Sequence, residues 1–305
     1  MRKRASPFSG EGSIVAPDGT RLWFRVSGEG PALIFQNGVG VTTTFWDAVA
    51  ERFAAAGYRT VVWDYRGHGR SEDPRDPNAL DLATCVEDLR AVMDALEIER
   101  ACLLGHSMGS QLGWEFYRLH PGRVAGLVPT LGTYRDAVST FYDLPWLAPR
   151  IFSAARFLAD SFPEVARKLA ALPSVHPRLA ERVIRRLAIV HPTLSPSDWL
   201  PTYLEHMARL DPRVFFALAK AIQEHDATDL LPRIRVPVLV VAGERDFFCP
   251  PRVAREMAER IPGAELLVIP AGSHAAIIEQ PDLFSLRLAS FLEERVFPPR
   301  RGKAA

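Results

Sequence analysis

The sequence predicts an α/β protein whose mostly parallel sheet is flanked by helices and interrupted by a helical insertion. Short apolar runs alternate with helical patterns over the first 130 residues and again after residue 236. These runs are apolar throughout, as in strands buried on both faces of a parallel sheet. The stretch between them has helical patterns that frequent prolines interrupt. We therefore expect an α/β core formed by 1–132 and 229–305, with a helical cap over 133–228.

The individual elements follow from two kinds of pattern. Runs rich in β-branched and aromatic residues predict strands, and apolar residues spaced three and four apart predict helices. The expected strands are Arg21–Val26, Ala32–Gln36, Thr60–Asp64, Ala101–Leu104, Val124–Val128, Pro237–Ala242 and Glu265–Ile269. The expected helices are Phe45–Ala56, Leu82–Leu96, Met108–Leu119, Arg252–Arg260 and Asp282–Arg295, with helical patches at Val165–Leu172 and Leu179–Val190 in the insertion.

Composition excludes several classes of protein. The chain has 305 residues, is 48% hydrophobic and carries a formal charge of +1, with acidic and basic residues interspersed. This balance predicts neither nucleic-acid binding nor a polybasic membrane patch. No apolar stretch reaches the roughly 18 residues that a membrane span requires. The partner expected on these grounds is a small-molecule substrate, and the oligomeric state stays open.

The cysteines and the N-terminal residues bear on the compartment. The three cysteines, Cys85, Cys102 and Cys249, are odd in number, and their spacing fits neither a disulfide framework nor a zinc site. The basic segment MRKRASPFSG is not followed by the apolar run of a secretory leader. We therefore expect a reducing compartment, the cytoplasm.

The stretch LLGHSMG places Ser107 at the end of an apolar strand and the start of a helix. It fits the pattern G-x-S-x-G, in which a serine occupies a strained strand-to-helix turn. Side chains two residues before and after the serine would collide in such a turn, which explains Gly105 and Gly109. Ser107 is therefore the candidate nucleophile, and Ser110 is expected to pack.

A serine hydroxyl needs a base, and the base needs an orienting carboxylate. His274 lies in a small-residue loop just beyond the last apolar strand, and we expect it to be the base. Asp246 follows the strand PVLVVA and is the expected acid, with Glu244 and then Asp136 as the other candidates. The chain order serine, acid, histidine is typical of one class of hydrolases.

A tetrahedral intermediate requires backbone N–H donors at its oxyanion. The amide of Met108, directly after the nucleophile, is one expected donor. The loop FQNGVG follows an early strand, and its glycines allow the backbone to approach a ligand closely. Val39 in this loop is the second expected donor.

Four motifs together give the chain a clear resemblance to the α/β-hydrolase superfamily, in its capped branch of carboxylesterase-like serine hydrolases. DYRGHGRS at 64–71 is similar to the family's D-x-R-G-x-G-x-S loop, GHSMG to its nucleophile elbow, GERD to its acid turn and GSHAAIIEQP to its histidine loop. The resemblance covers residues 12–296 and implies an eight-stranded sheet. We interpret the first motif as structural, with Asp64 and Ser71 making local hydrogen bonds.

The chain departs from the family at the oxyanion loop, where Asn37-Gly38 replaces the usual His-Gly. Backbone donors do not need that histidine, so we expect activity to survive. A serine in place of aspartate at the nucleophile disfavours epoxide hydrolases and haloalkane dehalogenases. The residues expected to contact substrate are Asn37, Gly38, Trp46, Phe141 and Trp146, with Phe152, Trp199, Phe215 and Phe216 as further candidates for the lining of the cap.

The predicted function is hydrolysis of carboxylic esters of small to medium apolar substrates through an acyl-enzyme, with no metal and no organic cofactor. The same three residues support other reactions: hydrolysis of C–C bonds, lactones or thioesters, and cofactor-free perhydrolase or haloperoxidase-like chemistry. A ligand-sensing protein built on a hydrolase scaffold is a further alternative. The sequence does not distinguish among these, because the shape of the cap decides.

Overall fold

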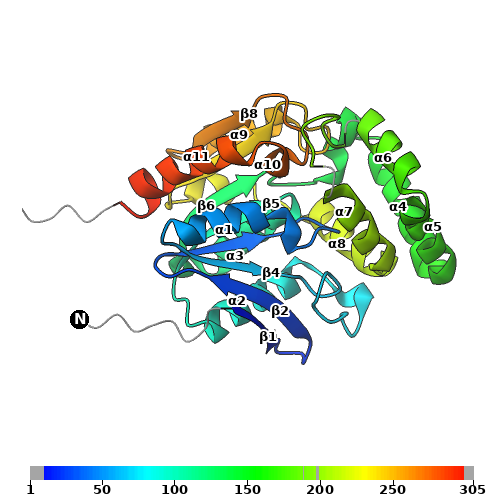
Figure 1. The fold of residues 1–305 in the computed structure, drawn as a ribbon, viewed down its shortest axis with the longest axis horizontal. Coiled ribbons are helices and arrows are strands. Elements are labelled where there is room, and N and C mark those ends of the chain that lie inside the picture. Colours follow the sequence, from blue (N-terminus) through cyan, green and yellow to red (C-terminus); the bar gives the residue numbers. More distant parts are fainter. Residues whose placement is uncertain (1–9, 188, 197–198, 299–305) are drawn as a thin grey trace, which may run out of the picture.

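The centre of the molecule is one twisted sheet (Figure 1). The computed structural model describes residues 10–298 except 188 and 197–198, so most of the basic N-terminal segment lies outside the described residues. Within this part of the chain the sheet has eight strands in the order β1-β2-β4-β3-β5-β6-β7-β8. The strands are β1 Gly10–Val15, β2 Arg21–Ser27, β3 Ala32–Gln36, β4 Arg59–Trp63, β5 Ala101–His106, β6 Val124–Thr130, β7 Leu239–Gly243 and β8 Glu265–Ile269.

Pairing is parallel from β4 to β8, while β1 and β2 pair antiparallel at one edge. The predicted α/β class and mostly parallel sheet are therefore confirmed. Strand β1 was not predicted; its sequence GEGSIV contains two glycines, and its residues are exposed or half-buried. An edge strand of this kind lacks the apolar run that signals a buried strand.

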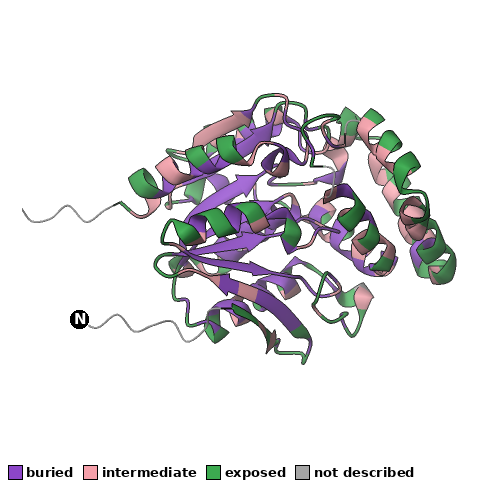
Figure 2. Cartoon of the chain, in the orientation of Figure 1, coloured by how far each residue is buried: buried purple, intermediate pink, exposed green. Residues whose placement is uncertain are grey.

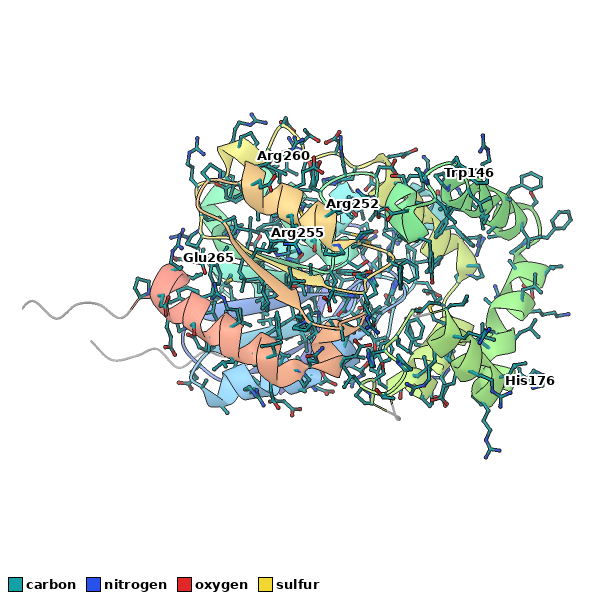
Figure 3. All side chains as sticks on the ribbon, turned by 90° about the horizontal axis from the view of Figure 1, so that it is seen from above. Trp146, His176, Arg252, Arg255, Arg260 and Glu265 are labelled. Carbon is teal, nitrogen blue, oxygen red and sulfur yellow. The ribbon has the colours of Figure 1, made fainter. Side chains whose placement is uncertain are left out.

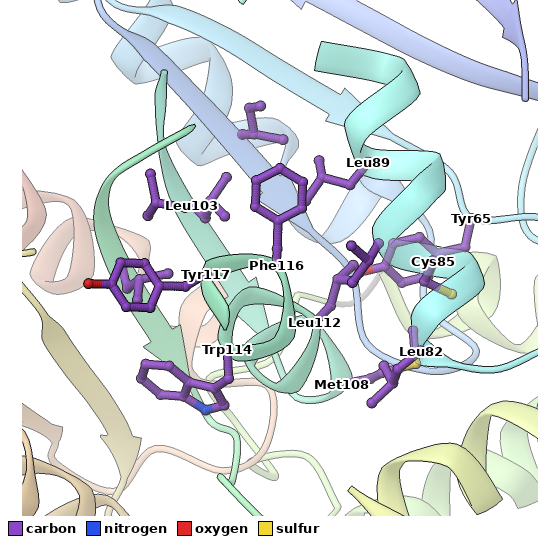
Figure 4. Close-up of a cluster of buried hydrophobic side chains, with 14 of the residues drawn as sticks. Tyr65, Leu82, Cys85, Leu89, Leu103, Met108, Leu112, Trp114, Phe116 and Tyr117 are labelled. Atoms are coloured by element: carbon purple, nitrogen blue, oxygen red, sulfur yellow. The ribbon is translucent and has the colours of Figure 1, made fainter. Parts of the chain in front are cut away.

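The central strands are buried on both faces, as their continuous apolar runs predict. In β3, Ile34 belongs to the core on one side of the sheet, and Leu33 and Phe35 belong to the core on the other. Helices α2 Leu82–Ala95, α3 Met108–Leu119 and α9 Pro251–Arg260 cover the first side. Figure 4 shows side chains of α2 facing those of α3 there. Helices α1 Asp47–Ala55, α10 Ala276–Glu279 and α11 Pro281–Phe291 cover the second side.

Two predicted helices differ from the observed ones at their ends. The helix expected from Phe45 begins at Asp47, after a 3-10 turn over Thr43–Phe45. The closing helix ends at Phe291 and continues as a π-helical turn over Leu292–Val296. None of the helices in the described part of the chain is both long and apolar enough to cross a membrane.

The segment between β6 and β7 contains helices and no strand among its described residues. They are helices α4 Ala148–Ser161, α5 Pro163–Val175, α6 Pro177–Arg186, α7 Trp199–Arg209 and α8 Pro212–Glu224, with 3-10 turns at Val138–Asp143 and Leu231–Arg233. An antiparallel bridge between Arg135 and Asp226 joins its two ends. The boundaries at 133 and 228 stay a prediction, and we refer to this segment as the insertion.

The prolines of the insertion explain why only two helical patches were predicted there. Pro149, Pro163, Pro177 and Pro212 lie in the first turns of α4, α5, α6 and α8. Proline is tolerated at this position because the first N–H groups of a helix have no intrahelical partner. These prolines therefore start helices, whereas the sequence analysis interpreted them as interruptions.

The loop after β4 is held by buried polar contacts. Asp64 accepts hydrogen bonds from the backbone N–H of Thr43 (3.2 Å) and of Arg70 (3.1 Å), and the Ser71 hydroxyl donates to the Asp64 carbonyl (2.6 Å). The structural interpretation of this motif is confirmed. Arg66 makes a two-pronged ion pair with Asp88 of α2, and both side chains are buried.

Replacing Asp88 with alanine should lower the free energy of unfolding by about 3 kcal/mol, because it leaves the buried Arg66 guanidinium without its main partner. Urea denaturation measures the change. Glu87→Ala is the matched control on the same helix, since Glu87 forms a half-exposed pair with Arg90 and should cost less than about 1 kcal/mol. Equal losses in the two variants would contradict the argument.

Candidate active site

The turn between β5 and α3 holds Ser107 in an unusual backbone conformation. Its φ of 52° and ψ of −116° lie in a region that non-glycine residues rarely occupy. Such a conformation costs about 1–3 kcal/mol and persists only where the surrounding structure enforces it. A Cβ on Gly105 would overlap the Gly109 carbonyl, and a Cβ on Gly109 would lie 2.6 Å from the Gln36 oxygen. The steric role predicted for both glycines is confirmed.

An acid–base pair lies at the carboxyl ends of β7 and β8. Nδ1 of His274 lies 2.9 Å from Oδ2 of Asp246. The other carboxylate oxygen, Oδ1, accepts from the backbone N–H groups of Phe248 and Cys249, both at 2.9 Å. Asp246 is buried, and both of its carboxylate oxygens have hydrogen-bond partners, so its position is fixed. It can hold the imidazole in one orientation with Nε2 left for chemistry.

The other two acid candidates lie elsewhere. Glu244 is exposed and accepts from the Ala271 N–H at 2.8 Å, where it braces the loop that leads to His274. Asp136 accepts from the Ser139 N–H at 3.3 Å and lines a different, polar groove. Of the three carboxylates, only Asp246 is paired with the imidazole of His274 among the described contacts.

The loop after β3 runs directly over the serine. A Cβ on Gly38 would lie 3.1 Å from Cβ of Ser107 and 2.9 Å from Nδ1 of His106. Only a glycine therefore allows this approach. Among the described residues, no acceptor bonds the N–H of Val39 or of Met108, the first residue of α3. Both donors are thus free for a ligand, as an oxyanion site requires.

Ser107 and His274 face one cavity of about 310 Å³ under the insertion. Gly38, Val39 and Phe141 line it too, as expected. Among the described residues that line it, the titratable side chains are the imidazoles of His106 and His274 and the phenol of Tyr203. The remaining lining comes largely from apolar side chains of the insertion and the neighbouring loops: Val41, Phe45, Phe152, Ile184, Ile189, Val190, Trp199, Leu200, Phe215, Ala219, Ile222, Phe248 and Ala275.

The structure places three of the residues predicted to contact substrate outside the cavity. Asn37 is fully buried, and its amide nitrogen donates to the Trp63 carbonyl at 3.0 Å. Trp46 is also fully buried, with its indole nitrogen 3.2 Å from the Gln36 carbonyl. Trp146 is 62% exposed and lies outside the cavity. The predicted lining residue Phe216 lies outside it as well, in a separate groove beside α4.

His106, next to the serine, has a role that the sequence analysis missed. Its Nε2 lies 3.0 Å from the carbonyl oxygen of His274, so Nε2–H is the donor. The Phe45 ring stacks on the imidazole with a centroid distance of 4.0 Å. Burial, reinforced by the neighbouring His274, holds the pKa of His106 well below its usual range. A neutral His106 therefore links the turn that carries Ser107 to the loop that carries His274.

Glu279 links the base loop to the insertion. Its carboxylate accepts from the backbone N–H (3.0 Å) and hydroxyl (2.6 Å) of Ser273, directly before His274. It also accepts from the His191 N–H (2.6 Å) and the Ser195 hydroxyl (3.0 Å) in the insertion. One buried carboxylate thus fixes two segments that line the cavity. The histidine-loop motif contains this glutamate, but its partners are distant in sequence.

His68 supports the oxyanion loop from the other side. Its Nε2 accepts from the Gly40 N–H at 3.0 Å, and its Nδ1 lies 3.1 Å from the Arg66 carbonyl, so Nδ1 carries the proton. Gly40 has a φ of +72°, a conformation that favours glycine. Burial, together with the charge of nearby His206, lowers the pKa of His68 to about 4. A neutral His68 can therefore hold the loop as an acceptor.

Asp246, Cys249 and His274 bring three potential metal-ligand atoms within 4.8 Å of one another. The geometry favours an acid–base pair instead. Both oxygens of Asp246 already accept hydrogen bonds, and burial beside this carboxylate raises the pKa of the Cys249 thiol well above its usual range. A protonated thiol is a poor metal ligand. All three cysteines are buried and free.

These features identify a family. The sequence model of the α/β hydrolase fold matches residues 31–281, and the chain belongs to that family. It is 30% identical over 289 residues to "Putative carbamate hydrolase RutD" of Caulobacter sp. (strain K31), which covers 89% of this chain and 95% of the relative. It is 26% identical over 286 residues to the proline iminopeptidase of Levilactobacillus brevis, with 89% and 93% covered.

A solved structure supports the fold independently. The esterase from Exiguobacterium antarcticum superposes with a TM-score of 0.75 at 21% identity, covering 94% of this chain and all of the other (100%). At this identity the likeness concerns the fold alone. The catalytic roles of Ser107, Asp246 and His274, and the oxyanion roles of Val39 and Met108, stay predictions that the geometry supports.

Two substitutions of His68 distinguish a hydrogen-bonding role from a packing role. His68→Leu removes the acceptor for the Gly40 N–H, and we expect kcat for a p-nitrophenyl ester to fall about 10- to 100-fold with KM little changed. His68→Gln places an amide oxygen near the position of Nε2 and should restore most of the rate. Steady-state kinetics at neutral pH provide both values. Equal losses of kcat in the two variants would assign His68 a packing role.

Proposed function

We propose that this chain is a serine hydrolase that cleaves carboxylic esters of small to medium apolar substrates. The observation that carries the proposal is the His274–Asp246 pair at 2.9 Å, with His274 and the strained Ser107 facing one largely apolar cavity. Asp and Glu side chains are absent from the described lining, as are Arg and Lys. A neutral acyl group fits such a lining, because burying an unpaired charge there would be costly.

In the proposed reaction, Nε2 of His274 takes the proton of the Ser107 hydroxyl as its oxygen attacks the ester carbonyl. The oxyanion accepts hydrogen bonds from the backbone N–H of Val39 and Met108. The intermediate collapses, the C–O bond breaks, and the protonated imidazole gives its proton to the departing alcohol. Water activated by His274 then attacks the acyl-enzyme, which releases the acid and restores the Ser107 hydroxyl. Asp246 orients and stabilises the imidazolium throughout.

In this proposal the enzyme acts on a small molecule in the cytoplasm and needs no metal or organic cofactor. Carbamate, lactone, thioester and C–C bond cleavage, and perhydrolase chemistry, use the same nucleophile and stay open as alternatives. The described lining does not favour a cationic substrate, because burying an unpaired ammonium group there would be costly. A carboxylate to receive that group is missing from the described residues that line the cavity.

A fluorophosphonate probe tests the nucleophile. We expect the wild-type chain to be labelled covalently and Ser107→Ala to lose both labelling and ester turnover, with a loss in kcat of about 10⁵-fold or more. Ser153→Ala changes an exposed serine of α4 and serves as the matched control. Labelling that persists in Ser107→Ala would refute the assignment. Labelling without multiple turnovers on any ester would point to a ligand-sensing protein.

The cavity volume predicts the preferred acyl length. About 310 Å³ lies near the lower end of ligand-pocket volumes. The value of kcat/KM on p-nitrophenyl esters should therefore be highest for butyrate or hexanoate and fall at least tenfold for palmitate. Phenyl carbamates and γ-lactones tested alongside separate the alternatives. A carbamate or lactone hydrolysed faster than every ester would overturn the ester assignment while leaving Ser107 as nucleophile.

A further inference from the structure

The outer side of α4, α5 and α6 exposes an unusual number of large apolar side chains. These helices lie together at one end of the molecule, and much of their surface is exposed (Figures 1 and 2). Phe157 is 68% exposed and Leu179 57%. We call the following set the apolar outer surface: Ile151, Phe157, Phe162, Val165, Leu169, Leu172, Leu179, Val183 and Leu187.

The spacing of these residues is that of an amphipathic helix face. Val165, Leu169 and Leu172 of α5 are separated by four and three residues, and Leu179, Val183 and Leu187 at α6 by four each. Residues at this spacing share one side of a helix. The opposite sides are used internally, since α5 packs on α7 and α8. A folded monomer rarely leaves so extensive an apolar surface without a partner.

Basic side chains accompany the apolar ones. Residues 142–187 contain eight Lys and Arg against four Asp and Glu. Each of the four acidic residues pairs with an arginine. Arg178, Arg182 and Arg186 form a second row on α6 beside the apolar one, and no described residue makes an ion pair with them. The net charge of +1 for the whole chain does not reveal this local excess of basic residues, which was not predicted from the sequence.

The charge decides between two occupants of the apolar outer surface. In a two-fold dimer, the same patch of both copies would meet, and the arginine rows would lie close to each other. Like charges held together in this way are destabilising. An anionic bilayer surface instead offers phosphate groups to the arginines and an apolar layer to the leucines and phenylalanines beneath.

We propose that the apolar outer surface of α4–α6, with the arginines of α6, docks this protein on an anionic phospholipid membrane surface. The protein lies on the membrane and does not span it, in keeping with the absence of a spanning helix from the described residues. Figure 3 shows side chains of this region, including Trp146 and His176, projecting away from the body of the molecule.

The same helices also line the catalytic cavity. Phe152 of α4 and Ile184 of α6 face the cavity, while Ile151 and Val183, their neighbours in sequence, are exposed on the outer surface. Docking would thus bring the roof of the cavity to a lipid surface in which apolar esters dissolve. This consequence rests on the proposed esterase function, whereas the membrane docking itself does not.

Sedimentation with sucrose-loaded vesicles tests the docking without using enzyme activity. The full chain should bind vesicles of phosphatidylcholine with 30% phosphatidylglycerol, weakly bind pure phosphatidylcholine, and dissociate as salt rises. The triple variant Arg178→Gln/Arg182→Gln/Arg186→Gln should lower the partition coefficient about a hundredfold, since each basic side chain contributes roughly fivefold near an anionic surface. Circular dichroism and thermal melting check that the variants are folded.

Two further variants separate specific docking from general electrostatics. Arg75→Gln/Arg245→Gln/Arg255→Gln removes the same charge from exposed positions of the core and should bind within about threefold of wild type. Leu179→Gln/Val183→Gln keeps the charge and should still lose most binding. Equal losses in the two arginine variants, or no binding by the wild type, would overturn the proposal. A dimer in analytical ultracentrifugation that Leu179→Gln/Val183→Gln dissociates would overturn it in favour of a second copy.

Discussion

The site depends on one steric constraint, the close approach of the β3 loop to the turn that carries Ser107. Because β3 and β5 are parallel neighbours, both turns emerge at the same edge of the sheet. Gly109 then lies against the Gln36 backbone and Gly38 against the serine itself. The left-handed φ of Ser107 is enforced by this packing. Any side chain at these glycines would push Ser107, the proposed nucleophile, away from the proposed backbone donors.

Two neutral imidazoles also hold the loops around this turn in place. His106 bonds the base loop, and His68 bonds the oxyanion loop at Gly40. Burial keeps the pKa of each histidine low, so each acts as a fixed dipole and not as a charge. The proposed base, His274, differs from them in having a carboxylate partner. Similar side chains thus have different roles because they have different hydrogen-bond partners.

The sequence was informative wherever the chemistry is local. The glycines around Ser107, the loop from Asp64 to Ser71 and the strands buried on both faces all follow from short-range sterics or periodicity. The cavity lining was not predictable in the same way, because it depends on where the insertion packs. A substrate contact was predicted at Trp46, but Phe45, the last residue of the 3-10 turn, lines the cavity, while Trp46, which follows that turn, is buried. Strand β1 has too few apolar residues to be detected.

The carboxylate of Glu279 has a consequence for how such a protein can change. It holds Ser273, beside the proposed base, and the segment from His191 to Ser195, which continues from the cavity lining. The same carboxylate therefore holds both the loop of the proposed base and a segment next to the cavity lining. An insertion exchanged between related enzymes would have to bring matching donors for this glutamate, or the graft would disturb the chemistry that it was meant to redirect.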